Sequence, residues 1–422
     1  MRKKRRKLKP QAILLLIVII LVIIIIVGSL FLKPKDNNNS NSTSADKMVE
    51  IKTITEANFL ANQYSLDLNI TYEYSDTIAK DSIISQSISV GTPIEIGQKL
   101  DVVVSLGKID KEKLASDNIN ELGTVPIMMY HGIVDKPSSE TGNTGGNVDK
   151  DGYNRTAEAF REDLEFYYQN DYRMVRLIDY VNGKIDVEYK KSPVILTFDD
   201  GNENNLKVTG LDSEGNIIID ENCAVGILES FKKKYPDFKV TATFFVNSTL
   251  FNQSEYDEKI ITWLVENGYD VGNHTENHLD IKASSSDKVQ KEIVSVYNQL
   301  EEIIPGKYVN IIALPFGSPY SKEHSNFKYV LNSTYENKTY DTIAALRVGW
   351  EPEVSPFNKN FDKTFLKRVR AYDNNGKEFD IKMSFDMLKT KRYISDGNVD
   401  TIVTSEANSS LIGDTTLEVI YY

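Results

Sequence analysis

Hydrophobic residues are concentrated at the start of the chain. Residues 12–32 form an uncharged, apolar run of 21 residues, close to the ~20 residues that a helix needs to cross a bilayer. A cleaved signal peptide is the alternative, but its apolar stretch is shorter, roughly 7 to 15 residues, and ends in a small-residue cleavage site that is absent here. The pattern therefore predicts a single transmembrane helix.

The segments that flank this run predict its orientation. Seven of the first ten residues are Lys or Arg and none is acidic, so the positive-inside rule places residues 1–11 in the cytoplasm and everything after Lys33 outside the membrane. Residues 33–48 are polar and have little to bury, which is typical of a linker. We expect a single-pass protein of the cell membrane with its main domains on the outer side.

Beyond residue 122, short apolar runs alternate with amphipathic stretches. The predicted strands are 126–130, 194–198, 240–246, 269–272, 309–314 and 343–347, and the predicted helices include 156–169, 223–234, 258–267 and 286–304. Strands that alternate with helices favour an α/β fold with parallel strands, and residues 123–422 are long enough for one barrel-sized domain. Residues 207–220 predict an inserted hairpin.

Residues 49–108 have a different pattern, with one helix (55–64) followed by short strands and turns. Four short stretches in this region resemble a PASTA domain: Tyr74-Ser-Asp-Thr77, Ile84-Ser-Gln-Ser87, Gly91-Thr-Pro93 and Val102-Val-Val-Ser105. The resemblance implies a small α+β domain that faces the cell wall and sometimes binds peptidoglycan, and a role as a spacer remains open. Residues 109–122 are predicted to be a second linker.

Composition narrows the classes of function. The chain is 41% hydrophobic and 26% charged, as in ordinary globular proteins, and its net charge of −12 becomes −19 without the first ten residues. Such an acidic body is a poor partner for nucleic acid. The single cysteine, Cys223, excludes intrachain disulfides and cysteine-cluster metal sites.

Candidate chemistry begins where the apolar strand 194–198 ends on Asp199, Asp200 and Gly201. In parallel α/β sheets the carboxyl ends of the strands are where sites are built, although Asp-Asp-Gly is also an ordinary turn sequence. The segment after strand 269–272 contains His274 and His278 in an i, i+4 spacing. On a helical turn these imidazoles would share one face and, with a carboxylate, form a three-ligand site typical of catalytic zinc.

Taken together, Thr197-Phe-Asp-Asp-Gly201, Ala242-Thr-Phe-Phe-Val246 and His274-Thr-Glu-Asn-His278 resemble the polysaccharide deacetylases, the NodB-type family 4 of carbohydrate esterases, over about residues 124–350. The resemblance implies a deformed (β/α) barrel. It also implies that Asp199 is the catalytic base and that Asp200, His274 and His278 bind a divalent metal, with zinc favoured and cobalt or nickel as alternatives.

Two departures from the family pattern concern the chemistry. The motif Arg-x-Pro-Tyr/Phe-Gly reads Ala313-Leu-Pro-Phe-Gly317 here, so the arginine that braces the catalytic aspartate is missing, and Arg347 is a weak candidate to replace it. Pro315, Phe316 and Gly317 remain candidates for binding substrate or the oxyanion.

No histidine follows His324, so the usual C-terminal general acid is also missing. A replacement lies at the other end of the domain, where Met129-Tyr-His131 resembles the circularly permuted deacetylases that act on poly-N-acetylglucosamine. This resemblance implies that His131 is the acid, and the alternative is that His131 only packs at the end of its strand.

The combined prediction is a membrane-anchored, metal-dependent hydrolase that removes N-acetyl groups from N-acetylglucosamine polymers outside the cytoplasm. Peptidoglycan is the favoured substrate because of the anchor and the PASTA-like domain, and poly-N-acetylglucosamine is second. Two alternatives stay open: a catalytically weak or inactive protein that binds cell-wall glycan, and an O-acetyl esterase that uses the same site.

Overall fold

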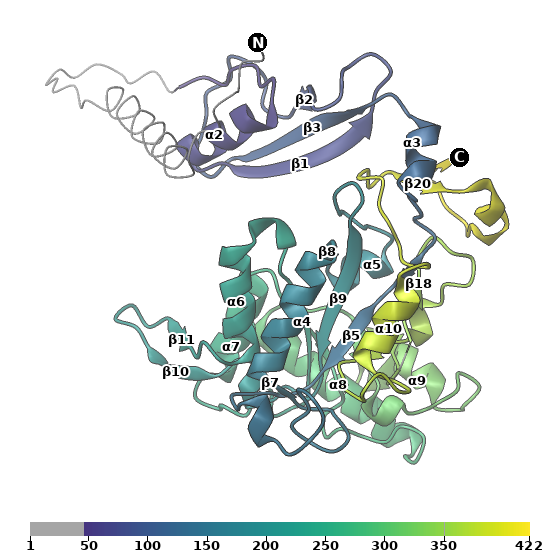
Figure 1. Ribbon diagram of the computed structural model, residues 1–422. Coiled ribbons are helices and arrows are strands. Elements are labelled where there is room, and N and C mark those ends of the chain that lie inside the picture. Colours follow the sequence, from purple (N-terminus) through teal and green to yellow (C-terminus); the bar gives the residue numbers. More distant parts are fainter. Residues whose placement is uncertain (1–45, 350) are drawn as a thin grey trace, which may run out of the picture. The chain divides into compact units, whose positions relative to one another are not determined.

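The computed structural model describes residues 46–349 and 351–422 (Figure 1). Within these ranges, no helix has both the length and the apolar character that a bilayer crossing requires. The predicted tail 1–11, the predicted transmembrane helix 12–32 and most of the linker 33–48 lie outside the described residues.

The first described domain is a three-stranded sheet with one helix. Its elements are α2 Ile54–Tyr64, β1 Asp67–Tyr74, β2 Ile83–Gln86 and β3 Lys99–Gly107. The strand order is β1-β3-β2, with β1 parallel and β2 antiparallel to β3. Leu100, Val102 and Val104 on alternate positions of β3 are fully buried, as expected for a sheet with one covered face. Residues 46–49 and 89–95 form a separate small unit, in which the N–H of Met48 donates to the carbonyl of Thr92.

An eight-stranded parallel sheet forms the core of the larger domain. Its strands are β5 Ile127–Tyr130, β8 Tyr172–Met174, β9 Ser192–Phe198, β12 Thr243–Val246, β13 Asp270–Asn273, β14 Ile311–Ala313, β17 Ala344–Leu346 and β19 Val369–Arg370. The order is β17-β14-β13-β12-β9-β5-β19, and β8 also pairs with β9. Every residue of β9 is buried, which explains its continuous apolar sequence. The predicted α/β class with parallel strands is confirmed.

Amphipathic helices surround this sheet (Figure 1). The longer ones are α4 Ala157–Gln169, α6 Ala224–Lys234, α7 Asp257–Glu266, α8 Ser286–Ile303 and α10 Ile381–Leu388. In α8, Val289, Ile293, Val296 and Leu300 are fully buried, so its apolar residues form one stripe toward the core. The hydroxyl of Ser285 caps its first turn by accepting from the N–H of Lys288.

Shorter elements complete the domain. They are α3 Lys111–Ser116, β4 Thr124–Val125, β6 Ile133–Val134, β7 Arg155–Thr156, α5 Leu177–Val181, β10 Val208–Leu211, β11 Ile217–Ile219, α9 Phe327–Leu331, β15 Asn332–Tyr335, β16 Lys338–Asp341, β18 Glu353–Val354, β20 Thr401–Thr404 and β21 Glu418–Tyr421. Strands β10 and β11 pair antiparallel, which confirms the hairpin predicted at 207–220. The segment 109–122, expected to be a linker, contains α3 and ends on the fully buried Glu121.

The sheet is a curled half-barrel whose hydrogen-bonded path ends at β17 and β19. The segment 366–370 lies between these edges. The N–H of Leu366 donates to the carbonyl of Ala345 in β17, and β19, which begins three residues later, pairs with β5. The residue at the centre of this segment, Arg368, has no exposed surface, so its side chain points into the curled sheet.

Candidate metal centre and catalytic groups

Asp199 and Asp200 follow β9 directly but face different partners. The N–H of Asp199 donates to the carbonyl of Tyr130 and so extends the pairing with β5 by one residue. Asp200 then turns the chain with a φ of +77°, and Gly201 follows with +60°. A Cβ on Gly201 would lie 2.0 Å from the carbonyl oxygen of Leu250, so only glycine fits there. This turn separates the two adjacent carboxylates.

The carboxylate of Asp199 is buried and fully paired. Both of its oxygens accept from Arg368, at 2.7 Å from Nη1 and 2.7 Å from Nη2. Burial alone would raise the pKa of Asp199, but the charge of Arg368 outweighs it and the pKa is lowered. Asp199 is therefore a carboxylate held in one orientation, as a base requires.

Arg368 supplies the brace that the sequence motif lacks. Its Nε donates to the carbonyl of Arg347 at 2.8 Å, whereas the Arg347 guanidinium lies over the ring of Phe365. The prediction that Arg347 replaces the missing arginine was therefore wrong, because the guanidinium that bonds to both oxygens of Asp199 is that of Arg368. The sequence offered one signal for Arg368. A residue missing from its usual motif can be replaced by one from the other end of the domain, as predicted for His131, and the same argument applies to the missing arginine.

Asp200, His274 and His278 converge on one point. The Nε2 atoms of His274 and His278 lie 3.2 Å and 3.5 Å from Oδ1 of Asp200, and the three ligand atoms all lie within 4.8 Å of one another. The segment 274–278 is not the helical turn that the spacing suggested. Positive φ angles at Thr275 and His278 bring the imidazoles together, and the amide of Asn247 holds the turn by donating to two of its carbonyls.

The donor set of these residues fits a cation. Nδ1 of His274 lies 2.8 Å from the carbonyl oxygen of Ala313, which can only accept, so Nδ1 carries the hydrogen and Nε2 presents a lone pair. Nε2 thus faces Oδ1 of Asp200, and both buried atoms lack a hydrogen-bond partner within the described residues. Two acceptors that face each other need a proton or a metal between them.

A single proton does not satisfy the whole group. The carboxylate of Asp200 outweighs burial and raises the pKa of His274, so a proton could fill the space between these two. Burial and the neighbouring His274 lower the pKa of His278, which leaves a third lone pair at the same point. Two imidazoles and one carboxylate are the donors of catalytic zinc sites, so this triad is a candidate divalent metal site.

His131 lies on the other side of Asp199. Its Nε2 is 4.0 Å from Oδ2 of Asp199, and its side chain is 12% exposed. Its Nδ1 is buried without a hydrogen-bond partner in the part of the chain that the structure describes. Burial lowers the pKa of His131, and the ring of Tyr153 packs edge-on against it with centroids 5.0 Å apart. The structure thus brings His131 to Asp199, as predicted, with ring atoms still available.

The segment 315–317 borders the triad on the side of His278. Phe316 is 53% exposed, has a φ of +58°, and its ring centroid lies 4.4 Å from that of His278. Pro315 has no N–H, and the N–H of Gly317 donates to the carbonyl of Leu314. The N–H of Phe316 has no acceptor among the described residues, which makes it the available main-chain donor for an oxyanion.

Comparison with known proteins identifies two domains. Residues 186–333 match the family model of polysaccharide deacetylases, and residues 49–106 match that of the PASTA domain. Over 154 residues the chain is 28% identical to the peptidoglycan-N-acetylmuramic acid deacetylase PdaA of Bacillus subtilis. That match covers 36% of this chain and 46% of PdaA, so the chain spans about half the length of this curated relative.

Solved structures with similarity to the chain are also deacetylases or related proteins. The Streptococcus pyogenes deacetylase PplD is 18% identical, with 60% of this chain and 93% of PplD covered and a TM-score of 0.43. IcaB from Ammonifex degensii is 18% identical with the same coverage and a TM-score of 0.37. From the family models and the sequence motifs, the chain contains a polysaccharide deacetylase domain preceded by a PASTA domain.

Proposed function

We propose that this protein is a divalent-metal-dependent N-deacetylase of N-acetylated cell-wall glycan, with peptidoglycan as the favoured substrate. One observation carries the proposal. The ligand atoms of Asp200, His274 and His278 lie within 4.8 Å of one another, beside Asp199, a carboxylate fixed by Arg368. Two of them, Oδ1 of Asp200 and Nε2 of His274, are buried without a hydrogen-bond partner among the described residues. A bound metal would polarise the acetyl carbonyl and make a water molecule acidic enough to attack near neutral pH. Zinc is the favoured ion, with cobalt and nickel as alternatives.

The protein's own groups account for the remaining steps. Asp199 takes the proton of the attacking water, because it is ionised and its oxygens are held in place. The free N–H of Phe316 donates to the carbonyl oxygen as negative charge develops there. His131 gives a proton to the departing amine, which is required because an amide anion is a very poor leaving group. The products are acetate and a glycan with a free amine.

The setting of this activity is part of the proposal. We infer that the segment 12–32 anchors the protein in the membrane with the PASTA and deacetylase domains outside the cytoplasm. The PASTA domain between the anchor and the enzyme supports a role at the cell wall, where it would contact peptidoglycan or act as a spacer. PdaA is a peptidoglycan deacetylase by name, which favours peptidoglycan over poly-N-acetylglucosamine.

Two other functions use the same residues. The glycan-binding alternative is favoured by two missing residues, the arginine of the motif at 313–317 and the C-terminal histidine. The position of Arg368 on Asp199 removes the first argument, and His131 beside Asp199 is a candidate replacement for the missing histidine. An O-acetyl esterase differs only in the bond that is cleaved, and a comparison of ester and amide substrates separates it from the deacetylase.

Acetate release tests the proposal. The purified full-length chain is incubated with peptidoglycan and with N-acetylglucosamine oligomers, after removal of metal and after addition of zinc or cobalt. We expect metal-dependent acetate release that is lost in Asp199→Asn. Glycan binding without acetate release under any metal would instead establish the binding protein, and release from O-acetyl groups alone would establish the esterase.

A further inference from the structure

Arg370 has an unusual environment for an arginine near a catalytic site. Its guanidinium carbon lies 5.1 Å from the ring centroid of Tyr153 and 4.4 Å from that of Tyr372. The side chain is partly buried, yet the guanidinium has no hydrogen bond or ion pair with any residue that the structure describes. By contrast, Arg155 and Arg368 are each paired with carboxylates.

This guanidinium lies at the edge of the catalytic site. Arg370 ends β19, where it stands opposite Met129 of β5, two residues before His131. The ring of Tyr153 contacts both side chains: its centroid lies 5.0 Å from that of His131 and 5.1 Å from the guanidinium carbon of Arg370. Arg370 and the proposed acid therefore share one aromatic neighbour, and Tyr153 is 38% exposed.

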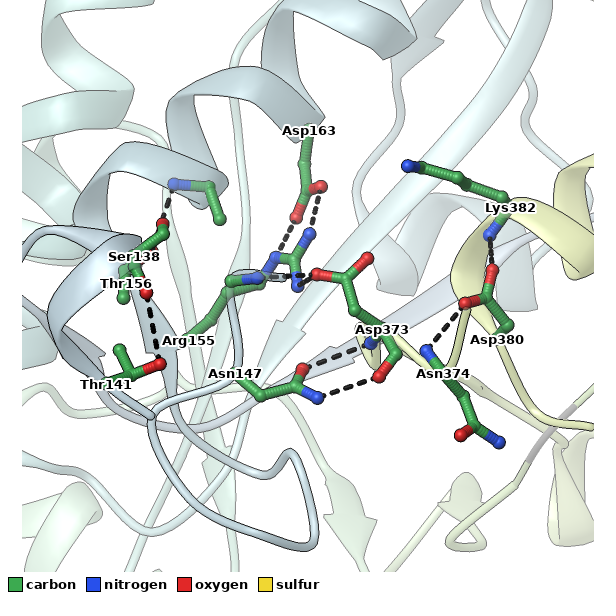
Figure 2. Close-up of polar contacts among 12 residues, drawn as sticks. Ser138, Thr141, Asn147, Arg155, Thr156, Asp163, Asp373, Asn374, Asp380 and Lys382 are labelled. Carbon is green, nitrogen blue, oxygen red and sulfur yellow. Dashed lines mark hydrogen bonds and ion pairs between the residues drawn. The ribbon is translucent and has the colours of Figure 1, made fainter. Parts of the chain in front are cut away.

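A hydrogen-bonded cluster holds the two tyrosines in place, and Figure 2 shows it. Arg155 lies between Asp163 and Asp373, and both amide atoms of Asn147 bond to the main chain of Asp373. These contacts tie the loop that carries Tyr153 to the chain just after Arg370. Gly152 packs directly against the other ring, because a Cβ there would lie 2.0 Å from Tyr372. The arginine and its two rings are thus fixed before any ligand arrives.

We propose that Arg370 binds a carboxylate of the substrate beside the acetamido group that is cleaved. This inference rests on the proposed deacetylase function. The rings of Tyr153 and Tyr372 cover the guanidinium and weaken its hydration, while its N–H donors point outward in the guanidinium plane. Such a fork matches the two oxygens of a carboxylate and pays little ordering entropy when it binds.

The substrate would then be an N-acetylated glycan that carries acid groups. N-acetylmuramic acid has such a group in the carboxylate of its lactyl ether. A peptide joined to that carboxyl by an amide bond removes its charge and brings carboxylates of its own. Poly-N-acetylglucosamine is uncharged and has none. Both charged sources offer the same chemistry to Arg370, so the test separates them.

Binding to the metal-free protein tests the inference without turnover. The full-length chain, kept in chelator, is titrated with oligosaccharides that alternate N-acetylglucosamine and N-acetylmuramic acid and with the same oligosaccharides whose lactyl carboxylate is amidated. We expect the charged form to bind about 10- to 100-fold more tightly, as for hydrogen bonds to a charged group. Arg370→Gln should abolish this preference, and Arg370→Lys should retain only part of it, because lysine keeps the charge but not the fork.

The control is Arg392→Gln, since Arg392 is also partly buried and lies over a tyrosine, Tyr172. This variant should keep the full preference. Equal binding of both oligosaccharides by the unmodified chain, or a preference that persists in Arg370→Gln, would overturn the proposal. Peptide-bearing oligosaccharides identify the source: tighter binding of the peptide-free form indicates the lactyl carboxylate, and tighter binding of the peptide-bearing form indicates the peptide.

Restoring the metal separates this inference from the proposed function. A preference that depends on Arg370, without acetate release from any glycan, would refute the deacetylase and leave the carboxylate site intact. The alternative outcome is acetate release with a ratio of kcat/KM, charged substrate over amidated substrate, that is the same in Arg370→Gln as in the unmodified chain. That outcome would refute the carboxylate site alone.

Discussion

Two clusters of titratable groups, the first buried and the second partly buried, differ in whether the protein supplies all their partners. In the first, the guanidinium of Arg155 bonds to both oxygens of Asp163 and to Asp373, so each charge has a partner (Figure 2). In the second, Asp200, His274 and His278 present lone pairs to one another. Both clusters join distant parts of the chain, yet only the first is complete.

This difference distinguishes a cluster that stabilises the fold from one that is suited to binding another group. A complete cluster offsets the desolvation of its own charges and holds loops together. Unpaired acceptors in the interior cost free energy and persist only where something else binds them. Positive φ angles at Asp200, Thr275 and His278 add strain at the incomplete cluster alone, as is common at functional sites.

Substitution within the incomplete cluster should have the largest effect. Asp200→Ala or His274→Ala removes a ligand, so metal affinity should fall by more than the ~10- to 100-fold that loss of an outer-shell partner costs. Asp199→Asn should keep the metal and lower kcat by about 10²- to 10⁴-fold, because only the base is lost. Metal content by atomic emission and acetate release check this pair of outcomes. Equal loss of metal in all three variants would show that the two aspartates do not have separate roles.

Breaking the complete cluster should act on stability and not on metal binding. Arg155→Met leaves the carboxylates of Asp163 and Asp373 buried without their cation, and this should lower the free energy of unfolding by about 3–5 kcal/mol. Urea denaturation measures the change, and metal content of the folded protein should stay at the unmodified level. The control is Arg161→Met, because among the described residues the Arg161 guanidinium bonds only to neutral groups, the carbonyl of Glu221 and the side chain of Asn222. Its effect should stay below about 1 kcal/mol.

Substitution of His131 tests whether the functional groups beside Asp199 include this histidine. His131→Ala should lower kcat about 10²-fold with little change in substrate affinity, since a general acid acts mainly in the transition state. Steady-state kinetics with the metal present separate kcat from KM. An unchanged kcat would mean that the buried, unbonded Nδ1 belongs to a histidine that only packs.

Glu121 is an intermediate case that sharpens the comparison. It accepts from the hydroxyl of Tyr393 and the N–H of Val403, but it has no ion pair with Lys or Arg in the described part of the chain. Burial and the nearby Asp396 raise the pKa of Glu121. Its carboxyl group therefore has hydrogen-bond donors but no positively charged partner among the described residues.

A raised pKa in the folded state sets the sign of the pH dependence. The contribution of Glu121 to stability is full below its unfolded pKa of ~4.3 and is lost as the pH rises through the folded pKa, at about 1.4 kcal/mol per pH unit in that window. Urea denaturation at several pH values should show this slope in the unmodified chain and a smaller slope in Glu121→Gln. The exposed Glu406→Gln should leave the slope unchanged, and identical slopes in all three proteins would exclude Glu121 as the cause.

The sequence predicted the site residues that directly follow strands. It missed a residue that reaches the site from a distant part of the chain. Asp199, Asp200 and His274 directly follow strands β9 and β13, where parallel topology brings side chains together, so local motifs were enough. Arg368 reaches Asp199 from 169 residues away, through a segment without a strong periodic pattern. The turn at 274–278 was also misjudged, because its positive φ angles depend on contacts such as those of Asn247 that no local pattern encodes.

The position of Arg368 has a consequence for when the candidate site forms during synthesis. Synthesis proceeds from the amino end, so seven of the eight sheet strands leave the ribosome before the segment 366–370 does. Until that segment takes its place between β17 and β5, Asp199 would be a buried carboxylate without a counter-charge. A chain that ends before residue 366 can therefore bring the candidate metal ligands together but lacks the counter-charge that keeps Asp199 ionised, so the complete candidate site forms only after the segment 366–370 has been made.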